Sequence, residues 1–272
     1  MSILLFGSTG MLGNYVLNVL RKKYNVICIT RDIYDIEKDD WEKLDDLIKK
    51  HLKENDIIIN CAGIIPQKYK NTDLKSYIKI NTLFPHKLNE ISNQLQLKLI
   101  HITTDCVYDG LKGDYTKIDT HSSSDIYGVT KSLGEPKEST IIRTSIIGEE
   151  LVGKKSLIEW IKSNKNGSIN GYVNHYWNGV TCLELAKIIK NIIDENNYWK
   201  GVRHIFSPDI VNKYELCCYI NKIYNLNITI EKHEDSISKN MTLCGENFYK
   251  INKIYNQIEE LLQFNLQSYF VT

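Results

Sequence analysis

The sequence of 272 residues has little proline, no long apolar run and no excess of charge of one sign. Four prolines leave no obvious hinge or proline-rich linker. No stretch approaches the roughly 18 apolar residues of a membrane span, and the start has no basic region before its apolar residues. The 34 basic and 33 acidic residues are mixed along the chain, which argues against a large nucleic-acid surface. We therefore expect a cytoplasmic protein that binds neither membranes nor nucleic acid.

Cysteine is present, but its pattern excludes two uses. The seven cysteines are an odd number without paired metal-ligand spacing, so we expect reduced thiols and no metal site. The hydrophobic content of 42% and the charged content of 25% are those of an ordinary globular protein. The length fits one large nucleotide-binding domain with a small appendage.

Short apolar runs alternate with helical periodicity in the first half of the chain, which predicts an α/β fold. Continuous apolar strands between helices indicate a parallel sheet covered on both faces, of the doubly wound Rossmann type. We predict an NAD(P)-binding domain over residues 1–148 and a mainly substrate-binding small α/β region over residues 149–272, with elements that can interleave. The expected strands are 3–6, 25–30, 56–61, 98–103, 139–143, 202–206 and 228–231. The expected helices are 11–23, 41–53, 83–94, 155–163, 183–195 and 213–224.

A glycine-rich turn follows the first expected strand and opens the first helix, where a dinucleotide fingerprint is found. Glycine lets the backbone approach a pyrophosphate, and the free N–H groups of a helix start attract its negative charge. A purely structural turn is the less favoured alternative. The candidate cofactor-binding residues of this turn are Gly7, Thr9, Gly10, Met11, Leu12 and Gly13.

The end of the second strand reads Thr30-Arg31-Asp32. An NAD-selective site usually presents a carboxylate there, whereas the guanidinium of Arg31 suits the 2′-phosphate of NADP. NADP(H) is therefore the preferred cofactor, and NAD(H) is the alternative because Asp32 is adjacent.

Tyr127 and Lys131 lie four residues apart, hence on one face of a helix. The same spacing recurs at Tyr34/Lys38, Tyr108/Lys112 and Tyr249/Lys253. Only Tyr127 follows the strand that ends near Thr104 by about twenty residues and begins a plausible helix. Hydride delivery to a ketone creates an alkoxide that needs a proton. We interpret Tyr127 as that acid, Lys131 as a charge that lowers the phenol pKa and holds the nicotinamide ribose, and Thr104 as a hydrogen-bonding group at the carbonyl oxygen.

With these residues in hand, the chain resembles the extended short-chain dehydrogenases/reductases, most closely the dTDP-4-dehydrorhamnose reductase branch. The resemblance covers nearly the whole chain. The motifs that carry it are Gly7–Gly13, Asn60-Cys-Ala-Gly63, Asn81, Thr103-Thr-Asp-Cys-Val-Tyr-Asp-Gly110, Tyr127-Gly-Val-Thr-Lys131 and Ile142-Arg-Thr-Ser145. It implies a catalytic trio of Thr104, Tyr127 and Lys131. It also implies cofactor contacts by Asp35, Cys61, Ala62, Gly63 and Asn81, with Asn81 supporting the active-site helix, and substrate contacts by Thr104, Asp105, Cys106, Asn174 and Trp177.

The resemblance implies NAD(P)H-dependent reduction of the C4 keto group of a nucleotide-linked 4-keto-6-deoxyhexose, in rhamnose-type deoxysugar biosynthesis. The stretch 170–179 departs from the usual pattern, so a UDP-linked sugar, including a 2-acetamido-2,6-dideoxy sugar, is as plausible as a dTDP-linked one. A homodimer is the assembly we consider.

Three alternatives stay open. Cys106 sits where related fucose synthases carry an epimerising cysteine, so a bifunctional 3,5-epimerase/4-reductase is one. Its second acid/base would be Lys154 or Lys155, and a cysteine packed in the interior is the simpler interpretation. The second is a non-catalytic regulatory subunit, like the β subunit of methionine adenosyltransferase. The third, an epimerase or dehydratase with tightly held NAD, is disfavoured because no glutamate follows Asp105.

Overall fold

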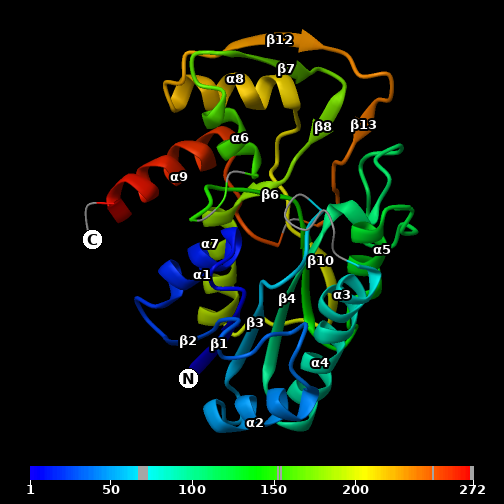
Figure 1. Ribbon diagram of the computed structural model, residues 1–272, viewed down its shortest axis with the longest axis vertical. Coiled ribbons are helices and arrows are strands. Elements are labelled where there is room, and N and C mark those ends of the chain that lie inside the picture. The colour runs from blue at the N-terminus through cyan, green and yellow to red at the C-terminus, as the bar shows by residue number, and fades with distance from the viewer. Residues whose placement is uncertain (67–72, 152, 154, 247, 270–272) are drawn as a thin grey trace.

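A six-stranded parallel sheet forms the centre of the molecule (Figure 1). The computed structural model describes residues 1–66, 73–151, 153, 155–246 and 248–269. The strand order is β10-β5-β4-β3-β1-β2, and every neighbouring pair runs parallel. These strands are β1 (Ser2–Phe6), β2 (Asn25–Ile29), β3 (Ile57–Asn60), β4 (Lys98–Thr104), β5 (Thr140–Thr144) and β10 (Gly201–His204).

Helices cover both faces of the sheet, which explains why its central strands are mostly apolar on both sides. They are α1 (Met11–Leu20) and α7 (Cys182–Asp194) on one face, with α2 (Trp41–His51) and α4 (Phe84–Gln94) on the other. Successive side chains of a strand point to opposite faces. Ile3 and Leu5 accordingly pack with α1 and α7, whereas Leu4 and Phe6 pack with α2 and α4. A strand buried on both sides needs an apolar residue at every position.

Short elements complete this half of the molecule around the carboxyl ends of the strands. They are α3 (Leu74–Tyr77), the π-helical η1 (Ile78–Leu83), the 3-10 helix η2 (Asp105–Val107) and α5 (Ile126–Leu133). Carboxylate caps define where several helices begin. Asp40 accepts from the backbone N–H of Lys43 at the start of α2, and Asp125 accepts from that of Gly128 at the start of α5, both at 2.8 Å.

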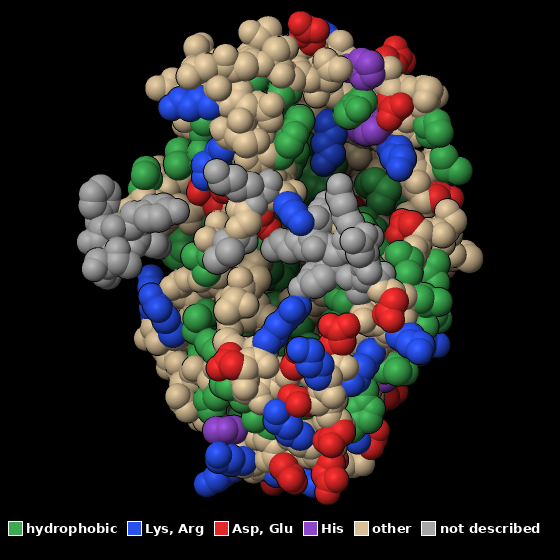
Figure 2. Space-filling model, viewed as in Figure 1, with side chains coloured by type: hydrophobic (Ala, Val, Ile, Leu, Met, Phe, Trp, Pro, Cys, Tyr) green, Lys and Arg blue, Asp and Glu red, His purple; other side chains and the backbone are tan. Residues whose placement is uncertain are grey.

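A smaller region lies beyond the carboxyl edge of the sheet, at the top of Figure 1. Its strands are β6 (Ile146–Ile147), β7 (Ser168–Tyr172), β8 (His175–Trp177), β9 (Val180–Thr181), β11 (Val211–Asn212), β12 (Thr229–His233) and β13 (Lys239–Asn240). Its helices are α6 (Leu157–Ser163), α8 (Lys213–Ile223) and α9 (Ile254–Tyr269). β7 pairs with β12, β8 lies between β11 and β13, and β6 pairs with β9. Basic and acidic side chains are interspersed over the visible face of the sheet-bearing half (Figure 2).

The predicted α/β fold with a doubly wound parallel sheet is confirmed, and the thirteen predicted elements match observed ones within a few residues. The boundary at residue 148 stays a prediction, although β10 and α7 come from beyond it and join the first half. The sequence analysis missed the two-residue strands, β7, β8, α3 with η1, and α9. All seven cysteines are free thiols. No helix within the described ranges has both the length and the apolar character needed to cross a bilayer.

Candidate active site

The glycine turn after β1 leaves the start of α1 open. Gly7 has a φ of +79°, which favours glycine, and a Cβ there would lie 2.7 Å from the backbone N of Ala62. A Cβ at Gly13 would overlap the Gly7 carbonyl oxygen. Gly10 precedes α1 in extended conformation, and neither a side-chain cap nor an acidic residue in the first turn occupies this helix start. The residues present therefore fit the pyrophosphate of a dinucleotide, which backbone N–H groups at a helix start can bind.

Two adjoining cavities open at this edge of the sheet. The first holds about 270 Å³ and the second about 360 Å³, and both are lined by Gly10 and residues 61–63. The predicted cofactor residues that line the first are Gly7, Thr9, Gly10, Arg31, Asp35, Cys61, Ala62 and Gly63. The predicted residues that line the second are Met11, Leu12, Thr104, Asp105, Cys106, Tyr127 and Lys131, besides the four shared positions. Two adjoining cavities with a shared wall thus bring together most of the residues selected from the sequence.

Tyr127 and Lys131 project from α5 toward the end of β4. The Lys131 ammonium donates to the Ile102 carbonyl oxygen at 2.9 Å. Burial lowers the pKa of Lys131 to about 8, while the Glu135 carboxylate opposes this shift. Burial raises the pKa of Tyr127, and the Thr104 hydroxyl only partly opposes that. The direction is opposite to the one expected from the Lys131 charge, because burial and the neighbouring acidic groups favour the protonated phenol.

Thr104 is tied into a local network at the start of η2. Its hydroxyl donates to Asp105 Oδ1 at 3.1 Å and accepts from the Cys106 backbone N–H at 3.2 Å. Burial raises the pKa of Asp105, against hydrogen bonds from Ser145 and Thr104. Burial and the Asp105 carboxylate also raise the pKa of Cys106. A thiol whose pKa is raised by burial is a poor base at neutral pH.

Asn81 lies behind the cleft and lines neither cavity. Its side chain is fully buried, accepts from the Ile64 backbone N–H at 2.9 Å and donates to Thr130 Oγ1 at 3.3 Å. It thereby joins the segment after β3 to α5. Two glycines let α5 pack closely here, because a Cβ at Gly134 would overlap the Asn81 carbonyl oxygen and one at Gly128 would overlap that of Cys106.

Gly13, Asn174 and Trp177 also lie outside both cavity linings. Asn174 instead exchanges hydrogen bonds with the backbone of Asp235, at 2.8 and 3.1 Å. Trp177 is 4% exposed and packs against the backbone at Gly179. The substrate contacts expected for these two side chains stay predictions.

The sequence analysis missed a buried charge beneath α5. Arg143, in β5, is 1% exposed. Its guanidinium donates to both carboxylate oxygens of Glu135 at 2.6 and 3.1 Å and to Tyr108 Oη at 2.6 Å. It also lies 2.7 Å from His121 Nε2 and 3.1 Å from His204 Nε2. A guanidinium can be buried when a carboxylate and other acceptors satisfy its donors together. The feature of the sequence that could have revealed this cluster is a charged residue within an otherwise apolar strand.

The sequence analysis also missed most of one wall of the second cavity. Glu150, Lys155 and Ser156 line it from the loop between β6 and α6. Lys155 was considered only as an epimerisation base, and Lys154 lies outside the described residues. Nothing local marks this loop, because its place at the cleft depends on packing of distant helices.

Comparison with known proteins identifies the family. The model of the RmlD substrate binding domain matches residues 1–236. The chain belongs to this family. A dTDP-4-dehydrorhamnose reductase of Aggregatibacter actinomycetemcomitans is 27% identical, over 80% of this chain and 77% of that protein. The methionine adenosyltransferase 2 subunit beta of Mus musculus is 24% identical, over 82% of this chain and 72% of that protein.

A solved structure gives the same fold. The dTDP-4-dehydrorhamnose reductase of Bacillus anthracis, in complex with NADP, superimposes with a TM-score of 0.83 at 17% identity, covering 97% of this chain and 99% of that one. The prediction of an oxidoreductase related to the dTDP-4-dehydrorhamnose reductases is confirmed at the level of the family.

Proposed function

We propose that this protein reduces the C4 keto group of a nucleotide-linked 4-keto-6-deoxyhexose, with NADPH as the hydride donor. The observation that carries the proposal is that the two cavities adjoin. Thr104, Tyr127 and Lys131 line one cavity, the glycine turn lines the next, and both share Gly10 and residues 61–63. Family membership and the reductase relative support the same reaction class.

Tyr127 is the proposed acid. NADPH supplies the hydride when bound, and the Tyr127 phenol gives its proton to the resulting alkoxide at C4. The raised pKa keeps the phenol protonated before reaction, as an acid must be. Thr104 holds the carbonyl oxygen, and its hydroxyl is oriented by Asp105. Lys131 holds the nicotinamide ribose and supplies positive charge beside the phenol.

NADPH is the proposed cofactor, with NADH as the weaker alternative. Arg31 and Asp35 line the first cavity at the end of β2, where an adenosine ribose would lie against the sheet edge. The guanidinium suits a 2′-phosphate through paired hydrogen bonds. The B. anthracis structure in complex with NADP is consistent with this choice.

A screen of nucleotide-linked sugars tests the proposal and identifies the substrate. Purified protein with NADPH is mixed with dTDP- or UDP-linked 4-keto-6-deoxyhexoses, including the 2-acetamido sugar. Loss of reduced-nicotinamide absorbance and NMR of the product identify the substrate. Tyr127→Phe should abolish turnover while NADPH still binds, and Tyr249→Phe is the control because that tyrosine has the same spacing to a lysine but lines neither cavity. Retained turnover in Tyr127→Phe contradicts the assignment.

Epimerisation by Cys106 is the less supported addition. The raised pKa of its thiol disfavours the thiolate that would abstract a ring proton. Incubating the 4-keto substrate with the protein in deuterated water, without cofactor, tests this directly. Deuterium at ring carbons beside the ketone, lost in Cys106→Ser, would establish the bifunctional alternative.

A regulatory subunit is the second candidate function, favoured by the likeness to the methionine adenosyltransferase subunit. The presence of Thr104, Tyr127 and Lys131 in one cavity weighs against it. Absence of ketone reduction with every sugar nucleotide, together with stable binding to a synthetase catalytic subunit, would favour this role.

We also propose a homodimer. Ile126, Val129 and Leu133 of α5 are 36%, 40% and 60% exposed, and Leu83 of η1 nearby is 48% exposed. Exposed apolar side chains gathered on neighbouring helices are typical of an interface. Light scattering should give a dimer mass that Leu133→Asp reduces to that of the monomer. A monomeric wild-type protein at micromolar concentration would contradict this.

A further inference from the structure

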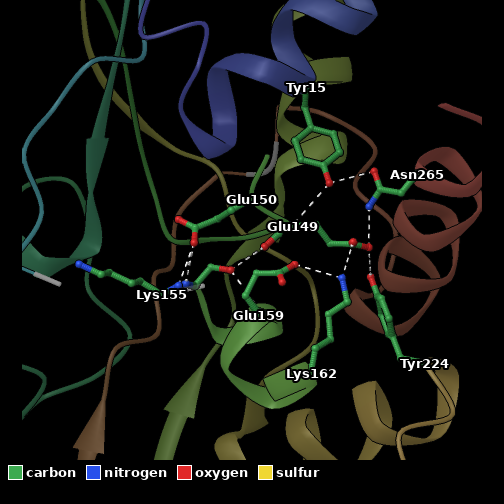
Figure 3. A network of polar contacts seen from close by, with 10 residues as sticks. Tyr15, Glu149, Glu150, Lys155, Glu159, Lys162, Tyr224 and Asn265 are labelled. Carbon is green, nitrogen blue, oxygen red and sulfur yellow. Dashed lines mark hydrogen bonds and ion pairs between the residues drawn. The ribbon is translucent and has the colours of Figure 1, made fainter. Parts of the chain in front are cut away.

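The loop between β6 and α6 forms a wall of the cavity that contains Tyr127 and Lys131. Its inner face is closed by Glu150, whose Oε2 accepts from the backbone N–H of Lys155 at 2.9 Å and of Ser156 at 3.3 Å. The Lys155 side chain extends away from the network around Glu149 (Figure 3). The position of this wall depends on how the preceding residue, Glu149, is held.

Three helices converge on the Glu149 carboxylate, whose side chain is 11% exposed. It accepts from Lys162 Nζ of α6 at 2.6 Å, from the Tyr224 hydroxyl just after α8 at 2.8 Å, and from Asn265 Nδ2 of α9 at 2.7 Å (Figure 3). These partners come from segments far apart in the sequence, so the carboxylate is satisfied only when all three helices are in place.

A second contact ties the same residue to the glycine-turn helix. The Glu149 backbone N–H points to the Tyr15 hydroxyl of α1 at 3.4 Å, and that hydroxyl donates to Asn265 Oδ1 at 3.0 Å. Gly148 packs closely as well, since a Cβ there would lie 3.3 Å from Met11 Cγ. Gly148 and Glu149 are therefore held against α1 on one side and against α9 on the other.

The phenol and the ammonium that donate to Glu149 keep their protons at neutral pH. Burial and the neighbouring carboxylate raise the pKa of Tyr224, so its hydroxyl keeps its proton over the whole working pH range. The pKa of Lys162 is also raised, by hydrogen bonds to Glu149 and Glu159 that outweigh burial. A largely buried carboxylate that loses one donor is left under-satisfied, which favours movement of its backbone toward water.

We propose that Glu149 is a positioning residue for the proposed ketone reduction, and that α9 acts through Asn265 to hold the wall formed by Glu150, Lys155 and Ser156 against the reaction cavity. The inference rests on the proposed function for its kinetic consequence, but the wall itself can be tested without any substrate. α9 lies beyond the residues that the family model matches.

Trypsin provides the substrate-free measurement, because Lys155 lies in the loop and is exposed. Cleavage beside Lys155 is timed by mass spectrometry in wild type, Glu149→Gln, Asn265→Ala and the double variant. Glu159→Gln is the matched control, since Glu159 also accepts from Lys162 at 3.1 Å but is not among the side chains that donate to Glu149. Thermal unfolding is recorded for each variant, so that local release is separated from global destabilisation.

We expect cleavage about tenfold faster in Glu149→Gln and in Asn265→Ala than in Glu159→Gln, at similar unfolding temperature, because about one charge-assisted hydrogen bond is lost. The double variant should be no faster than the faster single one, since both changes act on one contact. With a sugar-nucleotide substrate, KM should rise about tenfold while kcat changes less. Control-like cleavage rates in both single variants would overturn the inference. If no substrate is reduced by wild type, the proposed function fails while the proteolysis result still stands by itself.

Discussion

The two halves of the cleft are built in different ways. The cofactor half is lined by the turn between β1 and α1, by residues between 29 and 36 at the end of β2, by residues 61–64 after the neighbouring strand β3, and by Ile80. The reaction half takes side chains from β4, η2, α5, the segment after β5 and the loop before α6. Short segments that directly follow strands β1, β2 and β3 determine most of the first half. Long-range packing determines the second, so substitutions in the two halves should fail in different ways.

The largest effect is expected from Gly13→Ala. The added Cβ would overlap the Gly7 carbonyl oxygen within one short turn, and backbone cannot move aside as a flexible side chain can. We expect nicotinamide binding to be lost and stability to fall by about 2 kcal/mol. Titration of NADPH fluorescence and thermal unfolding measure both. Gly167→Ala, remote from the cleft, is the control. Wild-type NADPH affinity in Gly13→Ala would show that the close approach of residue 13 to the Gly7 carbonyl oxygen is not needed for cofactor binding.

The next effect concerns Lys131, where both halves meet. Its pKa of about 8 in the folded chain lies below the 10.5 of a free lysine. Between these pH values the unfolded state binds more protons at this lysine, so the contribution of Lys131 to the free energy of unfolding should rise with pH by about 3 kcal/mol, measured as the difference between wild type and Lys131→Met. Lys131→Met should lack this rise, whereas Lys200→Met, which removes an exposed lysine, should keep it. Denaturant titrations of the cofactor-free protein from pH 7 to about 11 measure these free energies. If burial did not lower the pKa of Lys131, the unfolding free energies of wild type and Lys131→Met would change with pH in parallel.

A smaller change is expected at the outer end of the cofactor half. Arg31→Ala should weaken NADPH binding about tenfold and leave NADH binding nearly unchanged, because only NADPH carries the 2′-phosphate that a guanidinium can grip. Dissociation constants for both cofactors, compared with those of Arg21→Ala, give the result. An equal loss for both cofactors would mean that Arg31 supports the strand end and does not select the phosphate.

The smallest functional effect is expected from Trp177→Phe. The indole is buried outside both cavities, so the change should cost about 1–2 kcal/mol of stability and alter the substrate KM by less than about threefold. Asn174→Ala should behave similarly. A large rise in KM without loss of stability would restore the substrate contacts that the sequence suggested for these residues.

The sequence predicted the parts of the molecule that depend on neighbours along the chain. The glycine turn, the apolar strands and the Tyr127/Lys131 pair follow from spacing of a few residues. Arg143, Glu149 and Asn265 were missed, because their importance comes from partners that are many positions away. For Trp177 the sequence left burial as plausible as stacking on a base or sugar, and the side chain is buried in the smaller region. The rise in the Tyr127 pKa was missed for the same reason, since burial is set by the tertiary structure.

The buried Arg143 predicts that the two halves of the cleft form at different times during folding. Its guanidinium meets groups from η2's end, the segment before α5, the end of α5 and β10, so partial assemblies that contain β5 alone leave an ion without partners. The β1–α1–β2 unit requires no such convergence on a buried ion, although α1 packs against α7 and β1 also pairs with β3. When the denatured chain is diluted into buffer, NADPH fluorescence enhancement should therefore return before catalytic turnover does.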